Sequence, residues 1–154
     1  MKAGDGKLTL KLDSWVIPFH DGPMHGFAIA GKDGRFQPAK AEWLNKNTGK
    51  GEPNWDRTTI VLTSDLVPEP IYFRYAWARN PLETLKSSDH SNLPFDTQRN
   101  DPFTLADMFE IYTGKKPSTP GVIHRGETRE LVEALKKEDL KRRVEEARKL
   151  INQP

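Results

Sequence analysis

The chain has 154 residues, of which 35% are hydrophobic and 30% charged, a composition that suits one compact domain with a small core and an appendage. The formal net charge is only +2, which argues against the clustered basic excess of a nucleic-acid-binding protein. The absence of cysteine excludes disulfides and thiolate metal sites.

The amino terminus, MKAGDGKL, lacks the apolar core of a secretory signal, and no segment approaches the length of a membrane span. We therefore expect a soluble chain that has no membrane span and binds no nucleic acid. The location of a longer parent protein stays open, because such a parent could carry its own signal and be periplasmic or secreted.

Up to about Asp101 the sequence predicts short strands separated by turn residues. The first strand alternates with period two and places Leu8, Leu10 and Leu12 on one face. Because no helix intervenes, residues 1–101 are expected to form a mainly β domain, an antiparallel β-sandwich or jelly-roll-like fold. The expected strands are KLTLKL (Lys7–Leu12), GFAIAG (Gly26–Gly31), AKAEWL (Ala39–Leu44), TTIVLT (Thr58–Thr63) and IYFRYAW (Ile71–Trp77).

Residues 102–154 change to a helical pattern and are expected to form a helical extension. Thr104 is expected to cap a helix over Leu105–Thr113, with Asp107 at its third position and Gly114 as its stop. A linker follows at Lys115–Gly121.

The apolar residues of the charged tail fall on two nearly opposite helical faces. The face changes at Lys137–Asp139, which predicts either a break with Asp139 near an N-cap or a helix that packs on two different partners. The first face holds Leu131, Val132 and Leu135, and the second holds Leu140, Val144, Ala147 and Ile151.

Catalysis requires a nucleophile, a base and an orienting acid, and the sequence displays no such set. Ser14 in LDSW loosely resembles a G-D-S nucleophile, but no glycine precedes it, and a polar residue on a sheet face is the preferred interpretation. His20 and His25 are five positions apart rather than the four of a helical zinc pair, and His90 and His124 lie far from both. No catalytic residue, metal site or cofactor is therefore predicted.

The stretch FRYAWARNP (Phe73–Pro81) is unusually aromatic for this polar chain. On a regular strand Phe73, Tyr75 and Trp77 face one side, either as core or as a platform on which a sugar stacks. The core interpretation is preferred for Phe73 and Tyr75, whereas Trp77, at the strand end, fits both.

This stretch, preceded by VPEP (Val67–Pro70), resembles the final conserved strand of the sialate O-acetylesterase family, RYAW-x-x-NP followed by NL…GLP…PFRTD. The continuation here, TLKSSDHSNLPFDTQRNDPF, keeps Leu93-Pro94 and Phe95 in a compressed and altered form. Upstream, DGPMHGFAIAGKDGRFQPAKAEW (Asp21–Trp43) resembles the family's DG-x-x-L-x-GF-x-IAG-x-D-x-x-F-x-PA-x-A. The two blocks lie in the family's order, and the resemblance covers about Lys7–Phe103.

The resemblance implies the C-terminal, non-catalytic β-rich region of an SGNH-type esterase that hydrolyses acetyl esters on sialic acid or another sugar. The family's nucleophile serine and D-x-x-H block lie upstream of this region, and neither motif occurs here, so no catalytic residue is carried over. The expected partners are an SGNH-type catalytic domain, in cis or encoded nearby, and an acetylated carbohydrate. At the end of the last strand, Trp77, Arg79 and Asn80 are the residues expected to reach that substrate.

Two other functions remain open. The chain could be a free-standing carbohydrate-binding module with Trp43, Trp55 and Trp77 as its platform. It could also be a protein-interaction domain whose helical tail recruits a partner or forms a dimer.

Overall fold

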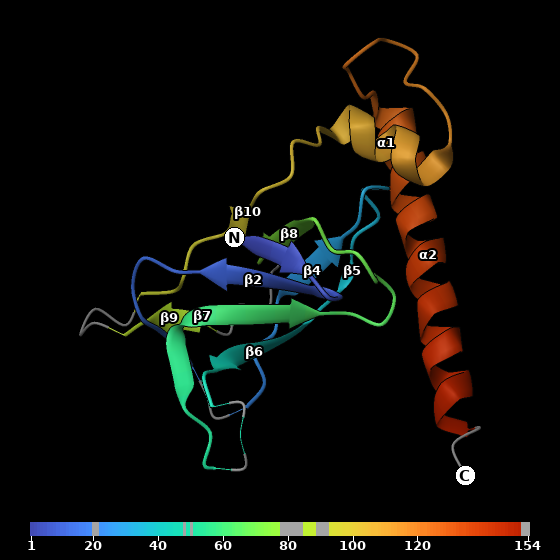
Figure 1. Ribbon diagram of the computed structural model, residues 1–154. Helices are drawn as coiled ribbons and strands as arrows, with labels where there is room; N and C mark the ends of the chain where they lie inside the picture. The colour runs from blue at the N-terminus through green and yellow to red at the C-terminus, as the bar shows by residue number, and fades with distance from the viewer. Residues whose placement is uncertain (20–21, 48, 50, 78–84, 89–92, 152–154) are drawn as a thin grey trace. The chain divides into compact units, whose positions relative to one another are not determined.

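The computed structural model spans residues 1–154 and describes all of them except 20–21, 48, 50, 78–84, 89–92 and 152–154. The chain divides into two compact units, Met1–Asp101 and Pro102–Pro154. The first unit is built from antiparallel sheets and the second from helices (Figure 1). The mainly β fold with a helical extension, which the sequence predicts, is confirmed.

The first unit contains two four-stranded sheets, with strand orders β1-β2-β7-β6 and β10-β8-β4-β5, and a two-stranded sheet of β3 and β9. All five expected strands are present, with shifted ends. The described strands are β1 (Lys2–Gly4), β2 (Lys7–Lys11), β3 (Val16–Pro18), β4 (Phe27–Ala30), β5 (Gln37–Pro38), β6 (Lys40–Asn45), β7 (Trp55–Thr63), β8 (Tyr72–Tyr75), β9 (Leu85–Ser87) and β10 (Gln98–Arg99).

The two four-stranded sheets bury their inner side chains in one shared core, as the sheets of a sandwich do. The predicted inward face of the first strand is confirmed, since Leu8 and Leu10 are buried and Leu12 packs against the core just beyond the strand. The core side chains of the first sheet include Leu8, Leu10, Ala41, Ile60 and Leu62, and those of the second include Phe27, Ile29 and Tyr75.

Helix α1 (Leu105–Thr113) begins and ends where the sequence predicts. The Thr104 hydroxyl accepts a hydrogen bond from the Asp107 N–H at 3.2 Å, and the Asp107 carboxylate accepts one from the Thr104 N–H at 2.7 Å. Gly114 ends the helix with a left-handed φ of 72°, which glycine adopts without steric cost. This capping box is therefore confirmed.

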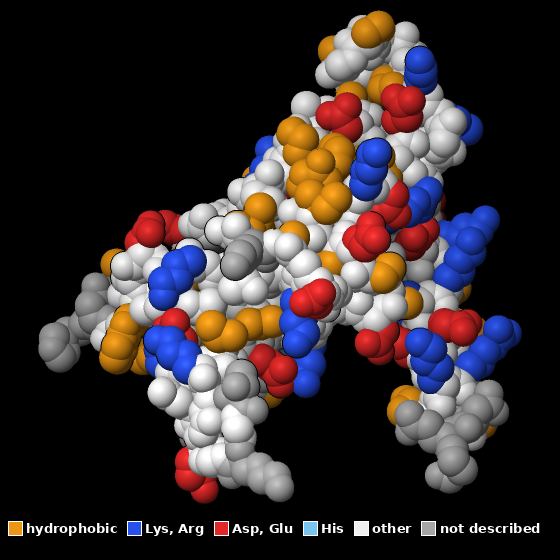
Figure 2. Space-filling model, viewed as in Figure 1, with side chains coloured by type: hydrophobic (Ala, Val, Ile, Leu, Met, Phe, Trp, Pro, Cys, Tyr) orange, Lys and Arg blue, Asp and Glu red, His pale blue; other side chains and the backbone are white. Residues whose placement is uncertain are grey.

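Helix α2 (Arg125–Ile151) is continuous, so the predicted break at Lys137–Asp139 is wrong. The Asp139 carboxylate does not cap a new helix but pairs with Arg142 and Arg143 in the following turn. Ion pairs at this spacing stabilise a helix and carry it through the point where the apolar face changes. Figure 2 shows acidic and basic side chains intermingled along α2. Within the described residues, neither helix has the length and apolar character needed to cross a membrane.

Candidate functional site

Trp77 lies just beyond β8, and the backbone turns it out of the core. Ala76 is buried and has a left-handed φ of 51°, an uncommon conformation for a residue with a side chain. Its N–H donates a 2.9 Å hydrogen bond to the Gly26 carbonyl. This residue ends the alternation of the strand, so Trp77 does not continue the inward face and is 49% exposed.

The exposed Trp77 ring is held by charged neighbours. The Arg99 guanidinium lies 4.7 Å from the centre of the ring, a cation–π arrangement. Arg99 is also 3.6 Å from the Asp101 carboxylate. That carboxylate accepts two hydrogen bonds from Arg74, at 2.8 and 2.7 Å, and the Arg74 guanidinium lies 4.0 Å from the Phe36 ring centre. Through Arg99, the Trp77 ring is thus linked to the bidentate ion pair of Arg74 and Asp101, and this contact restrains it at the surface.

The other aromatic residues of the same stretch belong to the core. Tyr75 is fully buried, with its ring centre 4.6 Å from that of Phe27 and 5.6 Å from that of Phe95. Its hydroxyl accepts a 3.1 Å hydrogen bond from the Leu85 N–H. Phe73 packs against the same core, so the core interpretation of both residues is confirmed.

Two of the residues expected to reach a substrate, Arg79 and Asn80, lie outside the described residues. Of the predicted set, Trp77 alone can be placed. Arg99 was not singled out from the sequence, because its position beside Trp77 depends on the pairing of β10 with β8.

A hollow of about 350 Å³ brings together the other two tryptophans of the expected platform, Trp43 and Trp55. Trp43 is partly buried against the core, whereas Trp55 is 46% exposed at the start of β7. Trp77 does not line this hollow, so the hollow brings together only two of the three rings of the expected platform. The hollow is lined by Pro18, Gly22, Pro23, Met24, His25, Ala39, Lys40, Ala41, Glu42, Trp43 and Trp55.

A sharp irregularity in β7 brings Trp55 to this position. Trp43 of β6 pairs with Ile60, but the next residue, Leu44, pairs with Asp56, so three residues of β7 bulge out between them. The bend is visible in Figure 1. Arg57, within the bulge, places its guanidinium 5.5 Å from the centre of the Trp43 ring. Bulges of this kind redirect side chains and are frequent near functional sites.

The carboxylate of Asp56 holds the bend together. It accepts hydrogen bonds from the Thr58 hydroxyl at 2.6 Å, the Thr58 N–H at 2.9 Å and the Thr59 hydroxyl at 3.0 Å. The ammonium groups of Lys46 and Lys11 lie 3.3 and 3.4 Å from it. The Thr58 hydroxyl and then the Thr58 N–H hold the pKa of Asp56 well below its usual range. Asp56 was not recognised in the sequence, because no motif marks a carboxylate that stabilises a bend.

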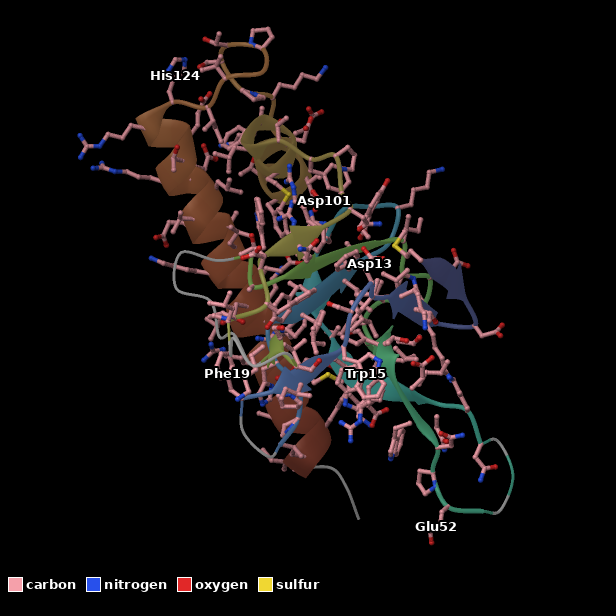
Figure 3. All side chains as sticks on the ribbon, turned by 90° about the vertical axis from the view of Figure 1, so that its left-hand side faces the viewer. Asp13, Trp15, Phe19, Glu52, Asp101 and His124 are labelled. Carbon is pink, nitrogen blue, oxygen red and sulfur yellow. The ribbon has the colours of Figure 1, made fainter. Side chains whose placement is uncertain are left out.

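Ser14 is exposed in a bend between β2 and β3, not on a strand face as expected. With Asp13 it lines a second hollow of about 300 Å³, to which no described histidine contributes. Figure 3 shows Asp13 on this connection. Among the described residues, therefore, no imidazole lies in the hollow beside Ser14 to act as its base.

The described histidines lie in separate parts of the chain. His25 lines the Trp43–Trp55 hollow, and His20 and His90 lie outside the described residues. His124 belongs to the helical unit, where its backbone N–H donates a 2.8 Å hydrogen bond to the Glu127 carboxylate and its imidazole Nε2 lies 3.0 Å from the Thr119 hydroxyl. In the part of the chain that the structure describes, no three histidines or carboxylates gather as metal ligands.

No protein family matches the sequence, and no match was found among curated proteins. Among solved structures, the chain is similar to a carbohydrate acetylesterase from Xanthomonas citri, with 31% sequence identity and a TM-score of 0.53. The similarity covers 67% of this chain and 22% of that protein's chain. It supports a relationship to carbohydrate esterases, while the more specific resemblance to sialate O-acetylesterases stays a prediction.

Proposed function

We propose that this chain is a non-catalytic β domain of a carbohydrate acetylesterase-like protein. The observation that carries the proposal is its 31% identity to a carbohydrate acetylesterase over 67% of its length, a match that spans only 22% of the esterase. The finer assignment, to an esterase acting on sialic acid or another acetylated sugar, rests on the FRYAWARNP and DGPMHGFAIAG motifs.

In this proposal the acetyl ester is cleaved by an SGNH-type catalytic domain, in cis or encoded nearby. Two observations support this division of labour: no described histidine lines the hollow that holds Ser14, and the sequence contains neither the D-x-x-H block nor the serine motif of the family. The β domain then walls the mouth of the catalytic site. Trp77, exposed and stacked with Arg99, is the described residue best suited to contact the sugar.

The first test is hydrolysis of an aryl acetate and of 9-O-acetylated sialic acid by the purified 154-residue chain. We expect no turnover above that of buffer, because the nucleophile serine motif and the D-x-x-H block of the family do not occur in this sequence. Turnover that persists through purification and disappears in Ser14→Ala, or in one of the histidine variants, would contradict the proposal.

The assignment of Trp77 requires the ring to lie outside the core, and Trp77→Ala tests this requirement. Since the ring is half exposed, we expect the variant to stay folded and to lose only about 1 kcal/mol, the contribution of an exposed cation–π contact. Urea denaturation followed by circular dichroism measures this loss. A variant that unfolds would show that Trp77 is part of the core and does not serve a substrate.

A further inference from the structure

The geometry points to a second carbohydrate site on this domain: the Trp43–Trp55 hollow binds one neutral pyranose ring. The ligand class rests on the proposed carbohydrate-related function, but the inference does not depend on whether the chain is catalytic. It separates two roles, with Trp77 near the proposed catalytic partner and the hollow as an independent subsite.

The size and lining of the hollow suit a small polar molecule with apolar faces. At about 350 Å³ it lies at the lower end of the range for ligand sites. Proline, alanine and methionine side chains line it beside the two indole rings, and the described polar side chains that join them are those of His25, Lys40 and Glu42. A mainly apolar wall with a few polar groups is the usual construction of a ligand site.

The two indoles are placed differently, and the difference suits a stacking site. Trp43 packs against the core on one side and has the Arg57 cation near its ring, so its orientation is fixed before a ligand arrives. Trp55 is half exposed and presents apolar surface to solvent. The C–H groups on a pyranose face carry slight positive charge and are attracted to the negative face of an aromatic ring.

Asp56 gives the hollow a fixed shape. Its carboxylate anchors the bend in β7 between Trp55, which precedes it, and Arg57, which follows it. The two side chains that frame Trp43 are therefore positioned by one set of hydrogen bonds. A site preorganised in this way loses less conformational entropy when a ligand binds.

The charges around the hollow favour a neutral sugar over an acidic one. The Lys40 ammonium lies 2.8 Å from the Glu42 carboxylate, so the cation on β6 already has a counter-ion. A carboxylate-bearing sugar would place a second anion beside Glu42. Recognition of a sugar carboxylate normally uses a bidentate arginine fork, and no arginine is among the described residues that line the hollow.

The test uses the full 154-residue chain with methyl β-glucoside, xylotetraose, cellotetraose and N-acetylneuraminic acid. Saturation-transfer NMR detects binding, and isothermal titration measures affinity. We expect saturable binding of at least one neutral sugar with a dissociation constant on the order of 1 mM or tighter. Trp55→Ala should weaken that binding by about tenfold or more, equivalent to about 1.4 kcal/mol, and Trp55→Phe should restore part of it.

Trp15→Ala is the matched control, because Trp15 is also exposed but does not line the hollow. Its affinity should equal that of the parent chain. Equal losses in Trp15→Ala and Trp55→Ala would place the binding elsewhere and overturn the inference. Absence of saturable binding by any neutral probe, or tighter binding of N-acetylneuraminic acid, would also overturn it. Ester turnover by the chain would instead contradict the proposed function and leave the sugar site standing.

Discussion

Several hydrogen-bond donors point at the single carboxylate of Asp56. Two hydroxyl groups, one backbone N–H and two lysines surround it, and the bend of β7 depends on this arrangement. All of these donors stabilise the charged carboxylate, so the folded chain keeps Asp56 ionised at pH values where an unfolded chain begins to protonate it.

The lowered pKa of Asp56 makes the stability of the β unit depend on pH. Its contribution is fully present above the pKa of the unfolded chain, about 3.9, and is lost as the pH falls towards the lower pKa of the folded state. We expect Asp56→Asn to be less stable than the parent chain at pH 7, and the difference to shrink as the pH falls below about 4. Urea denaturation at pH 7, 5, 4 and 3 measures it.

Thr58→Val removes one hydroxyl donor from the Asp56 carboxylate and retains the backbone donor. This variant should therefore lie between the parent chain and Asp56→Asn in its pH dependence. Parallel pH profiles for Asp56→Asn and the parent would show that the carboxylate does not contribute through its ionisation.

At the scale of elements, the pair Arg74–Asp101 joins the middle of β8 to the segment after β10. The Asp101 side chain is fully buried and that of Arg74 is 12% exposed. Water therefore cannot take the place of either ion's partner without a cost in the free energy of folding. We expect Asp101→Ala to lower the free energy of unfolding by about 3–5 kcal/mol, because it leaves a buried guanidinium without its main counter-ion.

A double variant separates the attraction between Arg74 and Asp101 from the cost of leaving one of them buried without its partner. Arg74→Met combined with Asp101→Leu removes both ions and should be less destabilised than Asp101→Ala alone. Chemical denaturation of the parent, of Arg74→Met, of Asp101→Leu and of the double variant gives the coupling energy between the two side chains. Losses that simply add would mean that the two residues stabilise the sheet independently.

The sequence predicts a helix or strand well where a local pattern determines its position. It predicts one poorly where the element depends on a partner that is distant in the sequence. Period-two alternation identifies the inner face of β2, and the Thr104–Asp107 capping box fixes the start of α1. Strands of two or three residues, such as β5 and β10, carry no period and exist because a neighbour pairs with them. The break expected in α2 fails because Asp139, a good N-cap residue, is engaged by arginines in the next turn.

The sequence predicts which residues belong to the candidate sites, but it does not predict where the fold positions them. The sequence singles out Trp43, Trp55 and Trp77 as aromatic candidates, yet a regular strand would put Trp77 on the same face as Tyr75. The left-handed φ of Ala76 turns Trp77 outward, and the bend at Asp56 brings Trp55 to Trp43. Neither irregularity has a local sequence signal, since alanine is not a residue that normally adopts positive φ.

At the scale of the whole molecule, the β unit has its own core, which includes no residue after Asp101. A chain truncated after Phe103 is therefore expected to fold, with dispersed amide signals in NMR and the circular dichroism of a β protein. Truncation at this point keeps Asp101 away from the new terminus. Collapse of the signal dispersion would show that the helices are needed to complete the fold.

Comparison of the solution masses of the full chain and the truncated chain tests the role of the tail. If the mass falls only by the deleted residues, α2 does not mediate assembly, and the interaction-domain alternative loses its support. A fall from a dimeric to a monomeric mass would assign the exposed Leu140 and Val144 of α2 to an interface between copies.

The positions of the tryptophans also determine what the intrinsic fluorescence of this protein can measure. Trp15, Trp55 and Trp77 are exposed and Trp43 is only partly buried, so the native indoles already contact water. Their emission should resemble that of the unfolded chain, and unfolding should shift the fluorescence spectrum little. A sugar or a docked domain that covers one of these rings should shift it to the blue. Intrinsic fluorescence is therefore a weak reporter of folding in this protein and a sensitive reporter of what its surface binds.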